Sequence, residues 1–143
     1  MFIGRYYHSL ETKGRLAIPK DYRPQLKSGG VITKGLDGCL FLFPNLSWNK
    51  LVAKLVSLPL TSTAARNFQR LLVQSSTKLV LDGQGRTLIP EYLRQEANLK
   101  RHVVVAGALQ RVEIWDRDSY HKYLDQLNKQ QEQMLTELSA LGI

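Results

Sequence analysis

Two short segments of the sequence place a carboxylate and an arginine four residues apart around a glycine. They are "ETKGRLAIP" at residues 11–19 and "DGQGRTLIP" at residues 82–90. A carboxylate at the start of such a turn can accept backbone N–H groups and pair with the guanidinium. The guanidinium is planar, permanently charged and matched in shape to phosphate oxygens or to a guanine edge. The pattern therefore predicts two turns that each fix the direction of an arginine.

The turn residues allow two interpretations. In the first, Glu11 and Asp82 are turn-bracing carboxylates, and their ion pairs with Arg15 and Arg86 are purely structural. In the second, the braced arginines bind a polyanion. Lys13 favours the second interpretation because it adds a charge that no turn needs. The recurrence favours it as well, since a two-fold arrangement would present the two arginines as a symmetric pair, as a two-fold DNA site would favour.

The excess of positive over negative charge lies in the first half of the chain. The 143 residues carry a net charge of +8. Residues 1–71 contain eleven Lys and Arg and three Asp and Glu, whereas residues 72–143 contain nine of each kind. An asymmetric basic surface predicts a polyanionic partner, most simply nucleic acid. The alternative is a solvated basic face without a partner.

The two turns belong to a longer internal repeat. Residues 11–51 align with residues 82–123 after a one-residue adjustment. The matched pairs include Gly14 and Gly85, Arg15 and Arg86, Ile18 and Ile89, Pro19 and Pro90, Arg23 and Arg94, Gly35 and Gly107, and Ser47 and Ser119. An ordered series of this length is typical of a duplicated unit. Because each unit alone is too small for a stable core, we expect the two to share one pseudo-two-fold core.

The elements that position the turns follow the same order in both units. A strand leads into the acid, the glycine turn follows, and a second strand runs to the Ile-Pro step. Proline ends that strand and suits the first turn of a short helix. Two further apolar strands and a longer helix complete each unit. The predicted fold class is α+β.

The boundaries of these patterns divide the chain into four parts. They are a first repeat at residues 5–47, a helical linker at 48–75, a second repeat at 76–119 and a C-terminal helix at 120–143. Within the linker, the residue pattern predicts a helix with Ser62 or Thr63 as its cap. Phe68, Leu71 and Leu72 are expected to face inward. The terminal pattern predicts one continuous helix over 118–142, whose apolar side chains pack on the chain itself or on a neighbouring copy.

Catalysis, metal binding and membrane insertion have no support in the sequence. His8, His102 and His121 are scattered without metal-ligand spacing, and no phosphate loop or nucleophile elbow occurs. The single cysteine, Cys39, lies in an apolar run and is expected to be a buried core residue, with a nucleophile as the minor alternative. We therefore predict a non-enzyme without cofactor, metal or small-molecule substrate. The start of the chain lacks a signal peptide, so we expect a cytoplasmic protein without a membrane partner.

Several ordered motifs resemble those of the MraZ family of bacterial transcriptional regulators. They are "MFIGRYYHSLETKGRLAIPKDYR", "GLDGCLFLFP", "LPLTSTAARNFQRLL" and "DGQGRTLIPEYLRQEANL" followed by "VVVAG" and "EIWD". The resemblance covers residues 1–123. Each half is also similar to the AbrB/SpoVT swapped-hairpin unit, in which an Asp-x-x-x-Arg turn precedes an Ile-Pro step.

The resemblance implies both a fold and a function. The implied fold is a pseudo-two-fold, AbrB-like swapped-hairpin β-barrel from two tandem repeats, with peripheral helices. The implied function is that of a nucleoid-associated regulator that binds short direct repeats in promoter DNA as a ring homo-oligomer. It would repress the division and cell-wall gene cluster, including its own promoter. The DNA-facing arginines of the family correspond to Arg15 and Arg86, with Lys13 beside the first.

Two residues depart from the family pattern. Glu11 stands where Asp is usual, and the extra methylene is expected to loosen the first turn. Arg5 stands where Glu is common after Gly4, which makes that face more basic and adds Arg5 to the candidate DNA-binding residues. The alternative function is a structural ring or scaffold protein that binds nucleic acid without sequence specificity. RNA binding is weaker, because the aromatic residues do not interleave with the basic ones.

Overall fold

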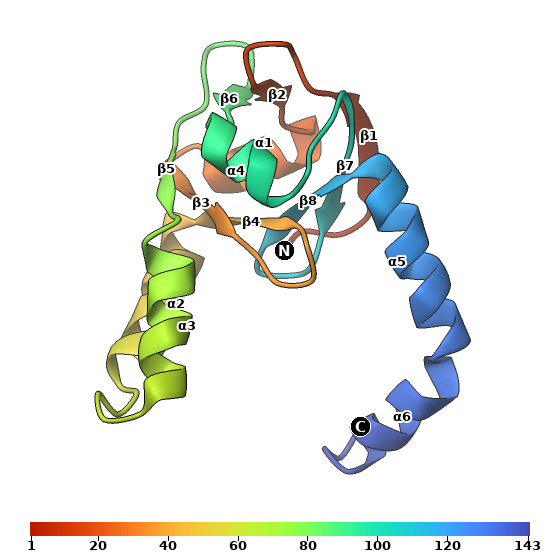
Figure 1. Cartoon of the computed structure of the whole chain (residues 1–143). Coiled ribbons are helices and arrows are strands. Elements are labelled where there is room, and N and C mark those ends of the chain that lie inside the picture. Colours follow the sequence, from red (N-terminus) through yellow and green to blue (C-terminus); the bar gives the residue numbers. More distant parts are fainter.

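The first unit forms its strands and helices in the predicted order. The computed structural model describes residues 1–143 (Figure 1). The elements of this unit are β1 (Arg5–Ser9), β2 (Arg15–Ala17), the 3-10 helix η1 (Lys20–Tyr22), α1 (Arg23–Leu26), β3 (Gly30–Lys34), β4 (Leu40–Pro44) and α2 (Asn45–Val56). The helical segment begins directly after Pro19, whose ring fixes φ and removes an N–H that the first helical turn could not pair.

The second unit repeats this order after a linking helix. The remaining elements are the linker helix α3 (Thr63–Val73), followed by β5 (Thr77–Leu79), β6 (Arg86–Leu88), α4 (Glu91–Glu96), β7 (His102–Gly107), β8 (Val112–Asp116), α5 (Arg117–Lys129) and α6 (Gln131–Ser139). The predicted cap of the linker helix is confirmed, because the Ser62 hydroxyl accepts a hydrogen bond from the backbone N–H of Ala65 at 3.2 Å.

The strands of the two units interleave in one six-stranded antiparallel sheet. Its order is β1-β7-β8-β4-β3-β5, and β2 pairs separately with β6. The order is symmetric about the β8–β4 pair. The first strand of each unit pairs with the third strand of the other, β1 with β7 and β5 with β3. Neither unit could complete its sheet alone, so the two units fold as one.

The α+β class is confirmed, but the implied barrel is not closed. Strands β1 and β5 are the two edges of the sheet and make no ladder with each other. Closure would require these edges to pair, and β5 has only three residues to offer. The six strands therefore form an open sheet with the β2–β6 ribbon as a second, separate layer.

The strands carry a core on each face of the sheet. In β4, Leu40 and Leu42 belong to a cluster that includes Ile18 and Ile89 of the two Ile-Pro steps. The alternate residues Phe41 and Phe43 belong to a smaller cluster on the opposite face. This alternation is the period of a strand with both faces covered. The larger cluster draws on both units, so the predicted shared core is confirmed.

The helices outside the core form two arms that extend away from the β2–β6 ribbon. Figure 1 shows the ribbon at the top, α2 and α3 side by side at the lower left, and α5 with α6 at the lower right. None of these helices has both the length and the apolar character that a membrane span needs. The ribbon and the arms thus occupy opposite ends of the molecule.

Two helix predictions were wrong in part. The terminal segment breaks at Gln130, which ends α5 and begins α6 with φ −101° and ψ 13°, so it is not one helix over 118–142. Neither α5 nor α6 contains a fully buried residue, so no packing holds the junction straight. In α3, Leu72 is buried, but Phe68 and Leu71 are 36% and 44% exposed. The helix lies against β3 and beside α2, where the Gln69 side chain donates to the carbonyl of Leu55 at 2.7 Å, and these neighbours leave Phe68 and Leu71 partly exposed.

Candidate nucleic-acid interface

The β2–β6 ribbon turns one face inward and the other toward solvent. Leu16 lies opposite Thr87 in the ladder, and these two side chains are 0% and 3% exposed. Because side chains alternate along a strand, the flanking residues point to the other face. That outer face consists of Arg15, Ala17, Arg86 and Leu88. The two predicted arginines therefore lie on one surface, at opposite ends of a short ribbon.

The two turns that lead into the ribbon share one backbone geometry. In the first turn, the Gly14 N–H donates to the carbonyl of Glu11 at 2.8 Å. In the second, the Gly85 N–H donates to the carbonyl of Asp82 at 3.0 Å. Both glycines have left-handed backbones, with φ of 92° and 76°. Side chains other than glycine rarely adopt this conformation, which explains why glycine occurs at both positions.

Each turn is tied to the Ile-Pro step of the other unit. The Ile18 N–H donates to the carbonyl of Gly85 at 2.9 Å, and the Ile89 N–H donates to the carbonyl of Gly14 at 2.8 Å. These reciprocal bonds extend the ribbon past its three-residue strands. The two turns are therefore fixed relative to each other, and so are the arginines that follow them.

A second pair of arginines, Arg23 and Arg94, braces the contacts between each turn and the Ile-Pro step of the other unit. The Nε of each donates to the isoleucine carbonyl of the Ile-Pro step in its own unit, at 2.8 and 3.0 Å. Each guanidinium also lies against the turn glycine of the other unit. A Cβ at Gly85 would lie 2.3 Å from the guanidinium carbon of Arg23, and one at Gly14 would lie 3.0 Å from that of Arg94. The sequence repeat pairs Arg23 with Arg94, but nothing local in the sequence indicates that they brace the opposite turn.

Asp82 caps its own turn. Its Oδ1 accepts the backbone N–H groups of Gln84 and Arg86 at 2.8 and 2.9 Å, and its Oδ2 accepts the Nε of Arg86 at 3.0 Å. The backbone N–H of Arg86, followed by that of Gln84 and by the Arg86 side chain, lowers the pKa of this carboxyl. The second turn therefore has the arrangement that the sequence predicts.

Glu11 does not repeat this arrangement. Its carboxylate accepts no bond from its own turn, and the predicted pair with Arg15 is absent. The Glu11 Oε1 instead accepts Nη1 of Arg86 at 3.2 Å, across the ribbon. The side chain that is one methylene longer reaches past its own turn. As a result Arg86 is held by two carboxylates and is 26% exposed, whereas the exposed Arg15 makes no hydrogen bond or ion pair.

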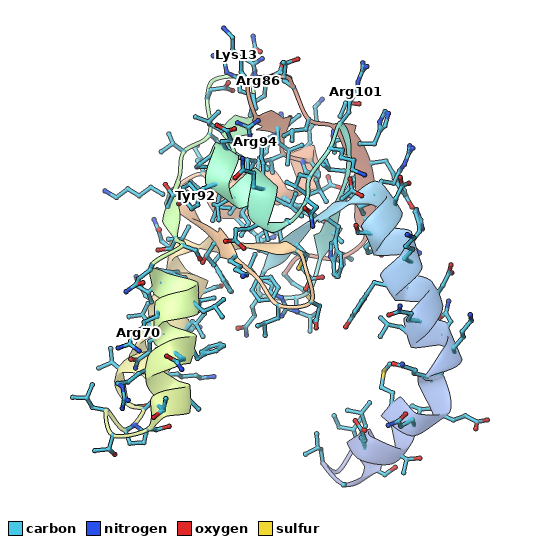
Figure 2. The ribbon with its side chains drawn as sticks, viewed as in Figure 1. Lys13, Arg70, Arg86, Tyr92, Arg94 and Arg101 are labelled. Carbon is cyan, nitrogen blue, oxygen red and sulfur yellow. The ribbon has the colours of Figure 1, made fainter.

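The remaining predicted residues lie in different places. Lys13 is exposed at the tip of the first turn, whose Glu11 contacts Arg86 (Figure 2). Arg5 begins β1, at the end of that strand farthest from the turn, and donates to the hydroxyl of Tyr120 in α5 at 3.3 Å. The structure thus brings Lys13, Arg15 and Arg86 together and leaves Arg5 beside the helical arm.

The cysteine lies in the core, and the potential metal ligands do not gather at one place. Cys39 is 2% exposed and its thiol donates to the carbonyl of Leu36 at 3.2 Å. Burial raises the pKa of this thiol well above its usual range, which disfavours a nucleophilic thiolate. No three His, Cys, Asp or Glu side chains gather in a way that could hold a metal ion.

Comparison of the sequence with known proteins finds matches in one family. The family model described as "MraZ protein, putative antitoxin-like" matches residues 1–71 and again residues 72–138. A protein of Alkaliphilus metalliredigens and one of Moorella thermoacetica are 42% and 44% identical to the chain, each over 100% of both chains. A protein of Heliobacterium modesticaldum is 46% identical over 123 residues, 86% of each chain. All three relatives are named transcriptional regulator MraZ.

Proposed function

The chain belongs to the MraZ family, and on this premise we propose that it is a DNA-binding transcriptional regulator that contacts bases with the outer face of the β2–β6 ribbon. The observation that carries the proposal is the pair Arg15 and Arg86 on one exposed surface, above the buried Leu16 and Thr87. A two-stranded ribbon is narrow enough to enter a major groove. Lys13, at the tip of the first turn, would contact the adjacent backbone.

The two arginines are suited to guanine recognition in different ways. Arg15 has every guanidinium N–H free, so it can donate to both O6 and N7 of a guanine. Arg86 already donates through Nε to Asp82 and through Nη1 to Glu11, which leaves Nη2 and one N–H of Nη1 for a ligand. Its position is set before DNA arrives, so it loses less side-chain freedom on binding. A good bidentate contact discriminates between bases by about 1–3 kcal/mol.

We further propose that regulation is repression at the chain's own promoter and the division and cell-wall gene cluster, through short direct repeats. Support comes from family membership and from the small size of one ribbon, which spans few base pairs. A ring of copies would dock several weak readers at once, and linked sites raise avidity by ~10²–10⁴ when the geometry permits. The crossed pairing of β1 with β7 and β5 with β3 supports a swapped-hairpin architecture within each copy. We place the protein at the nucleoid.

The test compares DNA from upstream of the chain's own gene with a scrambled duplex at moderate salt. Wild-type protein is expected to prefer the upstream DNA, and Arg15→Ala and Arg86→Ala are expected to lose that preference. Arg70→Ala is the matched control, because it removes an equal charge from α3, far from the ribbon in Figure 2. If both ribbon variants keep the wild-type preference, the ribbon is not the reading surface.

A scaffold role is the second candidate, because both arms expose apolar side chains. Leu46, Val56 and Leu60 around α2, and Leu135, Leu141 and Ile143 at the C-terminus, are each more than half exposed. Such surfaces favour association with protein. Equal weak affinity for the upstream and scrambled duplexes, together with a large assembly in a mass measurement, would support the scaffold over the regulator.

A further inference from the structure

A cleft lies beside the ribbon, between the short helix of the first unit and the turn of the second. Its volume is about 570 Å³. We call it the crossing cleft, and its lining consists of Lys20, Arg23, Pro24, Lys27, Leu81, Asp82, Gly83 and Gly85. One wall is the turn that sets the direction of Arg86. The crossing cleft is therefore adjacent to the reading surface but distinct from it.

The crossing cleft is lined by three cations that have unpaired N–H donors. Arg23 uses only its Nε, which donates to the carbonyl of Ile18, and its Nη groups make no hydrogen bond. Lys20 and Lys27 are exposed and take part in no ion pair. Gly85 has no Cβ, and a Cβ there would occupy the space of the Arg23 guanidinium. The glycine thus leaves room for this guanidinium to lie against the turn, while its Nη groups have no partner within the protein.

The single acid of the cleft does not neutralise these cations. Both oxygens of Asp82 face its own turn, where they accept the N–H groups of Gln84 and Arg86 and the Nε of Arg86. Because Asp82 is already paired with Arg86, its charge is compensated there, and the three cations of the cleft remain in excess. The cleft is therefore a site for an anion with several acceptor oxygens, and a phosphate group matches a planar guanidinium and two flexible ammonium groups.

We infer that the crossing cleft binds a phosphate of the DNA backbone that flanks the base contacts of the ribbon, an inference that rests on the proposed function. Arg86 and the cleft share the turn of residues 82–86, so a duplex contacted by Arg86 carries its backbone past the cleft. Phosphate contacts fix register and orientation without reading sequence. Arg23 then has two tasks, to brace the turn through Nε and to hold a phosphate through its Nη groups.

The equivalent cleft of the second unit is built less favourably for a phosphate. Arg94 takes the place of Arg23, but the positions that correspond to Lys20 and Lys27 are occupied by Glu91 and Asn98. The pocket beside Arg94 measures about 580 Å³ and gains Lys100 and Arg101 from the loop before β7. Glu11 lines it as Asp82 lines the first cleft, and the second unit has an additional acid, Glu91, beside Arg94 in an adjacent pocket. Figure 2 shows Arg94 on α4 and Arg101 on that loop. The stronger phosphate contact is thus expected in the first unit.

The test measures how affinity falls with salt concentration for the full-length protein. Each phosphate contact contributes about 0.9 to the slope of log K against log salt, and the cleft holds one phosphate, so the double variant Lys20→Ala, Lys27→Ala is expected to lower that slope by up to about 0.9. Its affinity for upstream and scrambled duplexes should fall by the same factor. The control Lys122→Ala, Lys129→Ala removes two exposed lysines from α5 and should leave the slope unchanged. Glu91→Lys should raise the slope by about 0.9, because it copies Lys20 into the second cleft.

The outcomes separate this inference from the proposed function. An unchanged slope in the Lys20 and Lys27 double variant overturns the phosphate site, even if Arg15→Ala abolishes the preference for upstream DNA. A loss confined to the upstream duplex overturns it too, since it would indicate base contact. Titration with inorganic phosphate is a second, independent measurement. Saturable phosphate binding below millimolar concentration, with no change in the slope for DNA, would assign the cleft to a free anion and contradict the inference.

Discussion

The acids that open the two turns differ by one methylene, and they hold the arginines in different ways. The backbones of the turns match, with glycine N–H to acid carbonyl distances of 2.8 and 3.0 Å and reciprocal bonds of 2.9 and 2.8 Å to the Ile-Pro steps. Asp82 closes on its own turn, whereas Glu11 crosses the ribbon to Arg86. The backbone template is thus set by glycine, isoleucine and proline, and the length of the acid sets the side-chain pairing.

This comparison gives the two arginines different physical properties. Arg86 is oriented before binding but shares its charge with two carboxylates. Arg15 is free, so ordering it on DNA costs side-chain entropy, of order 1.5–2 kcal/mol for a fully immobilised arginine. Its donors, however, are all available. The pseudo-two-fold fold therefore carries one fixed and one adaptable arginine.

The largest expected effect comes from breaking the turns themselves. Gly14→Ala should destabilise the protein by about 2–4 kcal/mol, because it combines a left-handed backbone with a Cβ only 2.7 Å from the fixed carbonyl of Ile89. Gly85→Ala should cost a similar amount, since its Cβ would lie 2.3 Å from the Arg23 guanidinium, and moving that side chain breaks its bond to the Ile18 carbonyl. Urea unfolding measures both variants. A loss below about 1 kcal/mol for either variant would contradict this account of the turns.

Removal of the braces is expected to have a smaller effect. Arg23→Ala and Arg94→Ala each leave an isoleucine carbonyl without its side-chain donor, at a cost of about 1–3 kcal/mol in unfolding free energy. The two values should agree closely, because the contacts are the same in both units. Chemical denaturation of Arg66→Ala, which alters exposed bonds on α3, supplies the control. A large difference between the two brace variants would show that the units are not mechanically equivalent.

A smaller effect is expected when the turns are made alike. Glu11→Asp should restore the local cap in the first turn, raise the unfolding free energy by about 0.5–1 kcal/mol and release Nη1 of Arg86. Asp82→Glu is the reciprocal variant and should lower stability by a similar amount. Thermal unfolding measures both changes. If Glu11→Asp destabilises the protein, then the cross-ribbon contact to Arg86 matters more than the local cap.

The smallest effect concerns pH. The pKa of Asp82 is lowered in the folded protein, so its ionised form adds stability that is present above the ordinary carboxyl pKa of about 3.9. That stability is lost as pH falls through the lowered pKa. The difference in unfolding free energy between wild type and Asp82→Asn should therefore be constant near neutral pH and shrink toward zero in acid. A difference that grows as pH falls would reverse the sign assigned to Asp82.

The sequence predicts what depends on local pattern and on repetition. Glycine turns, Ile-Pro steps, the Ser62 cap and the shared core follow from residue type and from the alignment of the units. The partner of Glu11 could not be predicted, because it lies 75 residues away in the other unit. The break at Gln130 also escapes prediction, since no glycine or proline marks it. The bracing role of Arg23 and Arg94 depends on contacts between the arginine of one unit and the turn of the other, and no local sequence pattern indicates these contacts.

Removal of single guanine N7 atoms from the DNA tests the base contact of Arg15 most directly. Each guanine of the upstream site is replaced in turn by 7-deazaguanine, and affinity is measured for wild type and for Arg15→Ala. At one guanine or more, wild type should lose part of the roughly 1–3 kcal/mol of a bidentate contact, because the bond to N7 is broken and the bond to O6 stays, and Arg15→Ala should show no further loss there. If every substitution weakens wild type and Arg15→Ala equally, the free arginine of the ribbon does not read DNA and the central claim fails.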